Sequence, residues 1–415
     1  MVSFEKACEK AIPFVLLSST FFIVVSLAMA FLLDGYGGDL LGVSLEVDAG
    51  SIFFLFFVYC MSVILFFLFF KSSFFVSKKT AFIPKINQWK NPQPVHFLAF
   101  SIIVFSFFVV TLTSTGTISR GGEGVRSIEL IFAFIQPFYF CIIYFYVFSA
   151  SGARVYFLNF VLFCFLCIMT GFVGYAFFLI PLVLKVLMSY VGRLKFFLLF
   201  VTGIFLMPFA HFYKYVFKYS LGLSDIYSII SIDLYFAFFR SIVDRFNYLP
   251  NMLFINDNIH QIRGFVDQVS YQPFYQGYLG SLLYKIFYSS SVSNLQGELN
   301  YMMHGLRSSN VTFPLPSYYF FDPAFFIVVS LYSFFLMFIL GVLLTRFYVS
   351  EKVMKYPFFV TTFFFLLQGW FWPFFNFIQA GVVFYICVSL CRISAYSLVS
   401  PCLSTKRHTR GVERT

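Results

Sequence analysis

The chain has 415 residues, of which 60% are hydrophobic and 68 are phenylalanine, and its mean hydropathy is +0.87. This much apolar surface cannot be buried inside a soluble domain, so the composition excludes a soluble protein and indicates a polytopic membrane protein. The net charge of +11 comes from basic residues scattered among the loops, which argues against a nucleic-acid-binding surface and favours a role in membrane orientation.

Apolar runs of roughly 17 to 23 residues predict an all-α bundle of about ten transmembrane helices. The predicted spans cover residues 12–33, 51–70, 97–116, 130–149, 155–170, 174–191, 196–212, 323–345, 357–373 and 377–396. Only the turn TGFVG separates the fifth span from the sixth. Residues 1–415 are expected to form a single membrane domain.

Charge distribution predicts the orientation of this bundle. Most lysines and arginines of the short connections fall in alternate loops and at both ends, whereas the opposite short loops carry only Arg120 and Arg126. The positive-inside rule therefore predicts that both termini are cytoplasmic. Joining the fifth and sixth spans into one helix would turn the basic C-terminus outward, so ten spans is the self-consistent number.

The segment 213–322, inserted between the seventh and eighth spans, is expected to be a large helical outer loop. It is too long for a featureless connection, so we expect it to fold over the mouth of the bundle. Its seven basic and seven acidic side chains balance, so any anion site within it must be local. Residues 224–250 are predicted to form a helix with one polar face, which includes Asp233, Arg240 and Asp244.

The stretch FFRSIVDRFN places Arg240, Asp244 and Arg245 close together. One interpretation is a surface ion pair between Arg240 and Asp244, four residues apart on the helix, which would contribute only a few tenths of a kcal/mol. The other is that an arginine faces a cavity next to the lipid and binds a phosphate through two hydrogen bonds. Arg245 lies about 100° around the helix from Asp244, so it cannot share that ion pair.

Two further stretches contain candidate site residues. In MMHGLRSSN, His304 could act as a general base near neutral pH and Arg307 could hold an anion beside it, or His304 could be a solvated loop residue. In SRGGEGVR, the glycines between Arg120 and Arg126 would let backbone amides approach a phosphate, although an ordinary outer turn fits equally well. The sequence contains no DxD, HExxH, P-loop or GxSxG pattern and no Cys/His metal cluster, so no metal and no cofactor is expected.

The layout resembles the Wzy-type O-antigen and capsule polymerases of bacterial inner membranes. The likeness rests on the number of spans, the large outer segment before the last three spans, the run MTGFVGYAFFLIPLVL, and the stretches FFRSIVDRFNYLPN and HGLRSSNVTFPLPSYYFFDPAFF. In that family the first run often reads TGSRG where residues 170–174 here read TGFVG.

The resemblance implies a metal-independent, inverting GT-C-type glycosyltransferase in the bacterial inner membrane, with its large loop in the periplasm. It would transfer a growing glycan from undecaprenyl diphosphate to an incoming lipid-linked repeat unit. The implied partners are the undecaprenyl-diphosphate-linked oligosaccharide, the lipid bilayer and a chain-length regulator protein. A nucleic-acid partner is not expected. The implied diphosphate-binding residues are Arg240, Arg245, Arg307 and Arg120, and the implied bases are His304 or Asp244.

Three alternatives stay open. An O-antigen ligase would use the same donor with a different acceptor. A flippase or transporter of lipid-linked glycans would be expected to show inverted repeats, broken helices and charges near mid-membrane, whereas here the predicted helices are almost free of charge, which favours chemistry at the outer face. In a structural or regulatory membrane protein, the outer arginines would simply pair with the equal number of acids.

Overall fold

The computed structural model describes residues 3–32, 48–80, 84, 92–114, 126–149, 153–170, 175–190, 248–269, 277–288, 295–305, 313–347 and 349–408, with isolated positions in 202–209 and 235–243. Across these residues the chain is helical and contains no strand. The helices are α1 (Phe4–Leu32), α2 (Ala49–Lys79), α3 (Gln93–Ser114), α4 (Arg126–Ile135), α5 (Pro137–Val147), α6 (Arg154–Thr170), α7 (Ala176–Tyr190), α11 (Leu249–Asp257), α12 (Ile259–Val269), α13 (Gly277–Tyr288), α14 (Leu295–His304), η5 (Leu315–Ser317), α15 (Tyr318–Phe321), α16 (Pro323–Thr345), α17 (Glu351–Val360), η6 (Thr361–Leu366) and α18 (Phe371–His408).

Six membrane-spanning candidates lie within the described part of the chain, judged by length and hydropathy. They are Phe4–Leu32, Ala49–Lys79, Gln93–Leu112, Leu130–Val147, Pro323–Thr345 and Phe371–Cys391. Helix α6 is apolar but shorter. The protein is therefore an all-α, multi-pass membrane protein, and the predicted total of ten spans stays a prediction, because most of the expected span 196–212 lies outside the described residues.

Two expected spans differ from the prediction. The span predicted over 130–149 is interrupted at Gln136, which has left-handed backbone angles (φ 52°, ψ 61°) and precedes Pro137. Proline disfavours the helical conformation in the residue before it, which accounts for the break between α4 and α5. The span predicted over 357–373 ends in the π-helical stretch η6, and the last helix starts at Phe371 and continues to His408.

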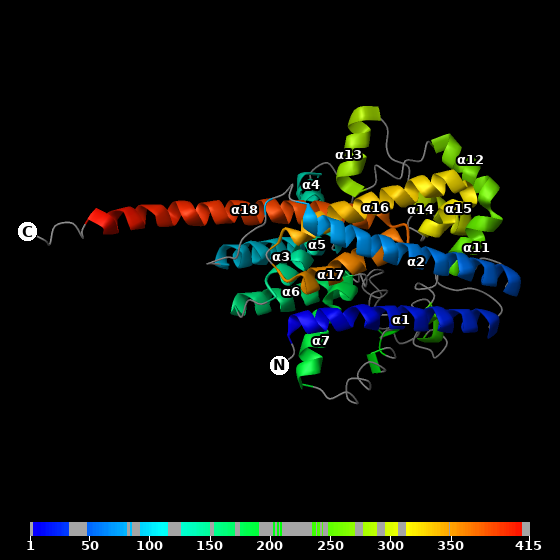
Figure 1. Cartoon of the computed structure of the whole chain (residues 1–415), viewed down its shortest axis with the longest axis horizontal. Helices are drawn as coiled ribbons and strands as arrows, with labels where there is room; N and C mark the ends of the chain where they lie inside the picture. The colour runs from blue at the N-terminus through cyan, green and yellow to red at the C-terminus, as the bar shows by residue number, and fades with distance from the viewer. Residues whose placement is uncertain are drawn as a thin grey trace, which may run out of the picture.

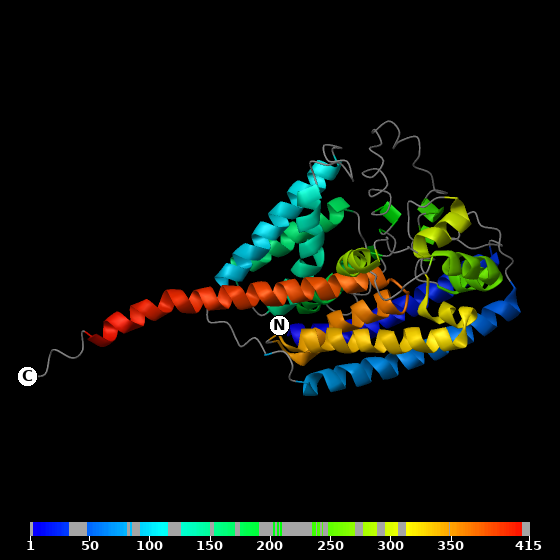
Figure 2. The same cartoon turned by 90° about the horizontal axis from the view of Figure 1, so that it is seen from above.

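The two ends of the bundle differ in what covers them. The start of α1 and the far end of α18 lie toward one end, whereas α11, α12 and α15 lie at the other (Figures 1 and 2). Helices α11 to α15 belong to the segment 213–322, so part of this segment covers the end of the bundle away from both termini. Which side of the membrane each end faces stays a prediction.

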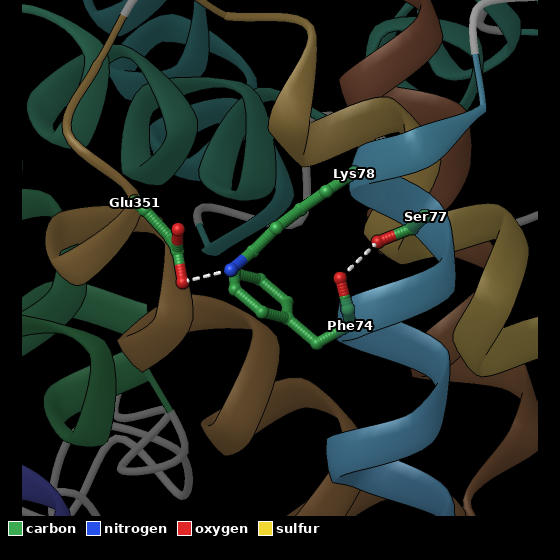
Figure 3. A network of polar contacts seen from close by, with 4 residues as sticks. All are labelled: Phe74, Ser77, Lys78 and Glu351. Atoms are coloured by element: carbon green, nitrogen blue, oxygen red, sulfur yellow. Dashed lines mark hydrogen bonds and ion pairs between the residues drawn. The ribbon is translucent and has the colours of Figure 1, made fainter.

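Ion pairs join three helices at the end that contains the N-terminus. Lys352 of α17 contacts Glu9 of α1, with 3.0 Å between Nζ and Oε1. Lys78 of α2 pairs with Glu351 at the start of α17 and lies 5.2 Å from the centre of the Phe74 ring (Figure 3). These side chains are exposed, so solvent screens both pairs and each contributes little to stability.

Helices α2 and α16 approach each other closely near this end. A Cβ at Gly341 would lie 2.8 Å from the Ser77 hydroxyl oxygen, so glycine permits the contact. The buried guanidinium of Arg346 donates a 3.4 Å hydrogen bond to the Ser77 carbonyl, in the last turn of α2. A cation at the C-terminal end of a helix is stabilised by the helix dipole, so Arg346 acts as a cap on α2.

Asp48 caps the opposite end of α2 and predicts an acid sensitivity. Its carboxylate accepts a 2.7 Å hydrogen bond from the Ser51 amide, and this bond lowers the pKa of Asp48 below its ordinary value of 3.8. Because the pKa is lower in the folded state, the ionised carboxylate stabilises the fold at any pH above the ordinary pKa. This contribution is lost as the pH falls through the folded-state pKa. We expect the thermal midpoint of Asp48→Ala to lie below that of the wild type at neutral pH and to converge with it in acid. Asp48→Asn keeps a capping oxygen but cannot titrate, so its midpoint should lie near that of the wild type at neutral pH and above it in acid. Parallel curves for Asp48→Ala and the wild type would contradict the assignment.

Candidate functional site

Two stretches of the chain meet where the segment 213–322 covers the bundle, and we call this contact the polar junction. It comprises residues 313–317, residues 366–370 and the side chains of Tyr248 and Gln296. The Leu315 amide donates a 2.9 Å hydrogen bond to the Leu367 carbonyl. Gly369 has φ +71°, and a Cβ there would lie 1.7 Å from the Phe313 carbonyl oxygen. Only glycine allows the two backbones to lie this close.

The π-helical stretch η6 immediately precedes the junction stretch 366–370 and ends at Leu366, its first residue. The hydroxyls of Thr361 and Thr362 each donate a 2.7 Å hydrogen bond to a carbonyl one turn back, and both side chains are buried. The Trp370 amide then bonds to the Phe365 carbonyl at 2.6 Å, as the chain turns toward α18. Short π-helical turns occur frequently at functional sites, which makes this segment a candidate for one.

Two uncharged side-chain amides form hydrogen bonds that connect the junction to α14 and to Tyr248, the residue before α11. Gln296 donates a 3.2 Å hydrogen bond to the Gly369 carbonyl, and Gln368 donates a 2.5 Å bond to the Tyr248 hydroxyl. Burial, with a smaller contribution from the nearby Tyr59, raises the pKa of Tyr248 well above its ordinary value. The Tyr248 hydroxyl is therefore protonated at neutral pH and acts as a neutral hydrogen-bonding group, not as a base.

Two buried polar atoms of the junction have no protein partner among the described residues. The Ser317 hydroxyl and the Trp370 indole nitrogen are buried, and neither makes a hydrogen bond within the described part of the chain. Buried polar groups are nearly always satisfied, so such atoms point to a water molecule or a ligand. The available groups are hydroxyl and N–H donors without formal charge, which suit a neutral, hydroxyl-rich ligand better than an anion.

An apolar groove adjoins the junction. It lies between α2 and α16, has a volume of about 200 Å³, and is lined among others by Phe66, Phe69, Ile327 and Leu331. Two serine hydroxyls in its wall bond to carbonyls of their own helices, Ser62 to Val58 and Ser333 to Val329, each at 2.8 Å, and most of the lining side chains are apolar. Leu315 lines this groove with its side chain and bonds into the junction with its backbone.

A second polar position occurs at the helix break at Gln136. Gln379 of α18 donates hydrogen bonds to the carbonyls of Ala133 (3.0 Å) and Phe134 (2.6 Å), and Gln136 itself donates a 2.6 Å bond to Ala133. A helix that ends at membrane depth leaves carbonyls that cannot bond to water in lipid. The two glutamines supply the missing donors.

A third polar group links α3, α5 and α6. The Nδ1 atom of His96 lies 2.7 Å from the Tyr144 hydroxyl oxygen, and the Asn159 amide donates to that oxygen and to the His96 carbonyl at 3.2 and 2.9 Å. All three side chains are buried. Hydrogen bonds of this kind between membrane helices contribute to their association, and we interpret the group as structural.

The structure describes two of the six site residues predicted from the sequence. His304 is exposed and is the last residue of α14, before Gly305 with φ +67°. Arg240 is half-buried in a short helical stretch. Asp244, Arg245, Arg307 and Arg120 lie outside the described residues. The predicted diphosphate cluster therefore stays a prediction.

The sequence interpretation missed the polar junction and the glutamines at the helix break. A signal was present, since Gln368, Asn376 and Gln379 are amides within an otherwise apolar stretch, and all three are buried. The pairing of residues 313–317 with 366–370 had no signal in the sequence, because it joins positions about fifty residues apart through backbone atoms. Comparisons with protein-family models, curated proteins and solved structures find no match to this chain.

Proposed function

We propose that the protein polymerises lipid-linked oligosaccharide repeat units of an O-antigen, capsule or exopolysaccharide. The observation that carries this proposal is the position of Leu315 in both the apolar groove and the polar junction. An apolar groove beside neutral hydrogen-bond donors fits an amphipathic ligand with a hydrocarbon chain and a sugar head. The resemblance to the Wzy-type polymerases supplies the reaction.

In the proposed reaction an acceptor sugar hydroxyl attacks the anomeric carbon of the donor glycan. The bond from that carbon to the undecaprenyl diphosphate oxygen breaks, the diphosphate leaves with the bonding electrons, and the hydroxyl proton passes to a base. Arg240, Arg245, Arg307 and Arg120 are proposed to bind the leaving diphosphate, and His304 or Asp244 to take the proton. His304 is eight residues from Gln296 on the same helix, so it lies about 12 Å along the axis from a junction contact.

Trp370→Phe tests the junction as a sugar-binding site. The indole nitrogen makes no hydrogen bond within the described residues, so losing it should cost little stability while the ring is retained. If the nitrogen donates to a sugar hydroxyl, we expect roughly a tenfold loss of glycan transfer, corresponding to about 1.4 kcal/mol. Trp372→Phe is the matched control, since Trp372 is exposed and outside the junction. Equal activity of the two variants at equal expression would contradict the assignment.

Deleting the gene separates the proposed reaction from its alternatives. Cell-surface glycans would be resolved by gel electrophoresis and lipid-linked glycans extracted in parallel. A polymerase deletion should leave single repeat units on the surface in place of a ladder. A ligase deletion should leave long polymer on the lipid carrier, and a flippase deletion should leave unpolymerised units inside. A surface ladder of unchanged length would overturn the proposed function.

A lipid-linked glycan flippase or transporter is the second candidate, because the break between α4 and α5 favours it. Broken helices with satisfied backbone groups are typical of transporter binding sites. The groups beside this break are the neutral Gln136 and Gln379. The deletion experiment distinguishes the two candidates by where the unpolymerised repeat units accumulate.

A further inference from the structure

Helix α13 runs across the direction of the membrane-spanning helices. It stands upright in Figure 1 and is seen end-on in Figure 2, whereas α16 and α18 extend along the horizontal axis in both views. It packs against α18 and against α4. A helix perpendicular to the spans lies parallel to the membrane plane.

The side of α13 that faces the bundle is made of small and partly buried residues. Gly280, Ser281 and Tyr284 are half-buried, and the Tyr284 ring stacks on that of Tyr288 with 4.7 Å between centroids. This face accounts for the packing against the bundle.

One side of the described surface of α13 is apolar and exposed. Leu282, Leu283, Ile286 and Phe287 are all exposed, with Ile286 at 64% and Phe287 at 70%. At 100° per residue these four side chains cover an arc of about 140° that contains no polar residue. Lys285 lies about 60° from Leu282, at the edge of this arc. We call the four residues the apolar face of α13.

The neighbouring helix α4 also has exposed apolar side chains. Leu130, Ile131 and Phe134 of α4, a helix that α13 contacts, are about half exposed. Leu130 begins one of the membrane-spanning candidates of the described chain, Leu130–Val147, so the exposed side chains of this segment are expected to face lipid. The apolar face of α13 thus adjoins a surface that lipid covers.

We infer that the apolar face of α13 inserts into the lipid bilayer, so that α13 is an in-plane membrane helix. Amphipathic helices of this kind bury their apolar side below the headgroups and keep charged residues at the edge. Lys285 is placed to extend its ammonium group to the headgroup phosphates, with its aliphatic stem along the apolar surface. A second copy of the chain is a less suitable occupant, because it would leave the cation at the edge without an identified partner.

Photocrosslinking of the full-length protein tests this inference. Benzoylphenylalanine would replace Phe287 or Leu283 in turn, with the protein in vesicles of phosphatidylethanolamine and phosphatidylglycerol. Tyr284 is the matched control, since it is one position from Leu283 and belongs to the packed side. After irradiation, mass spectrometry of the α13 peptides would measure lipid adducts.

We expect lipid adducts to be several-fold more abundant at positions 283 and 287 than at 284, where crosslinks to α18 should dominate. Two apolar positions are used so that one variant that fails to fold leaves the other to report. A crosslinked dimer at position 287 would show that a second copy covers the face and would overturn the inference. So would crosslinks at 287 to another segment of the same chain, or the lack of any adduct at both positions, which would indicate exposure to water.

Discussion

Replacing Gly369 by alanine is expected to destabilise the protein by about 4 kcal/mol or more, because the added Cβ would make the closest contact found at any described glycine. The added Cβ would lie 1.7 Å from the Phe313 carbonyl oxygen, which belongs to the backbone and cannot rotate away. The positive φ of Gly369 adds a strain of about 1 to 2 kcal/mol for any residue with a Cβ. The two stretches of the polar junction would have to separate, which would break the hydrogen bond between Leu315 and Leu367.

Alanine substitutions at two other glycines distinguish the effect of the steric clash from that of the positive φ. Gly305 also has a positive φ, but no described residue lies within 4 Å of its added Cβ, so alanine there should cost only the strain of about 1 to 2 kcal/mol. Gly264 lies within α12, where its added Cβ would meet none of the described residues, and alanine there should stabilise the helix by about 0.5 to 1 kcal/mol. Thermal unfolding of the purified proteins would measure their midpoints, which should decrease in the order Gly264→Ala, wild type, Gly305→Ala, Gly369→Ala. Equal losses at Gly305 and Gly369 would show that the junction opens without cost.

Most of the helices could be predicted from the sequence, because long apolar runs determine them. The runs near 51–70 and 323–345 became α2 and α16. The ends were predicted less well, since helices continue past the apolar run when polar residues such as Lys78 and Lys79 add further turns. The interruption at Gln136 was missed although Pro137 marks it, because the apolar run continues through both residues.

The site predicted from the sequence and the site found in the structure rest on different residue types. Charged residues are conspicuous in an apolar chain, so Arg240, Asp244 and His304 were selected by their rarity. The polar junction depends on Gly369, Gln368 and Tyr248, whose importance follows from long-range contacts and from one backbone angle. Such contacts join positions up to 120 residues apart and leave no local pattern. The two sets are compatible, since a lipid-linked diphosphate sugar needs cations for its phosphates and neutral donors for its hydroxyls.

Gln379→Leu is expected to lower the free energy of unfolding by about 2 to 3 kcal/mol, because it leaves the Phe134 carbonyl without its donor. The Ala133 carbonyl keeps its bond from Gln136, so the further change Gln136→Ala should cost more in the Gln379→Leu background than in the wild type. Ser389→Ala is the control on the same helix, since that hydroxyl only adds a bond to a carbonyl one turn back in its own helix, and we expect little change. Thermal unfolding in detergent and in lipid measures all four variants.

The size of this effect also bears on which of the two candidate functions is correct. If protein and lipid surround the break between α4 and α5, an orphaned carbonyl has no alternative donor and the full loss should appear. If the break lines a water-filled cavity, water replaces the glutamine and the thermal midpoint should hardly move. An unchanged midpoint for Gln379→Leu would contradict the structural interpretation of the break and favour the transporter, whereas a full loss would support a fixed bundle that holds the polar junction in place for glycan transfer.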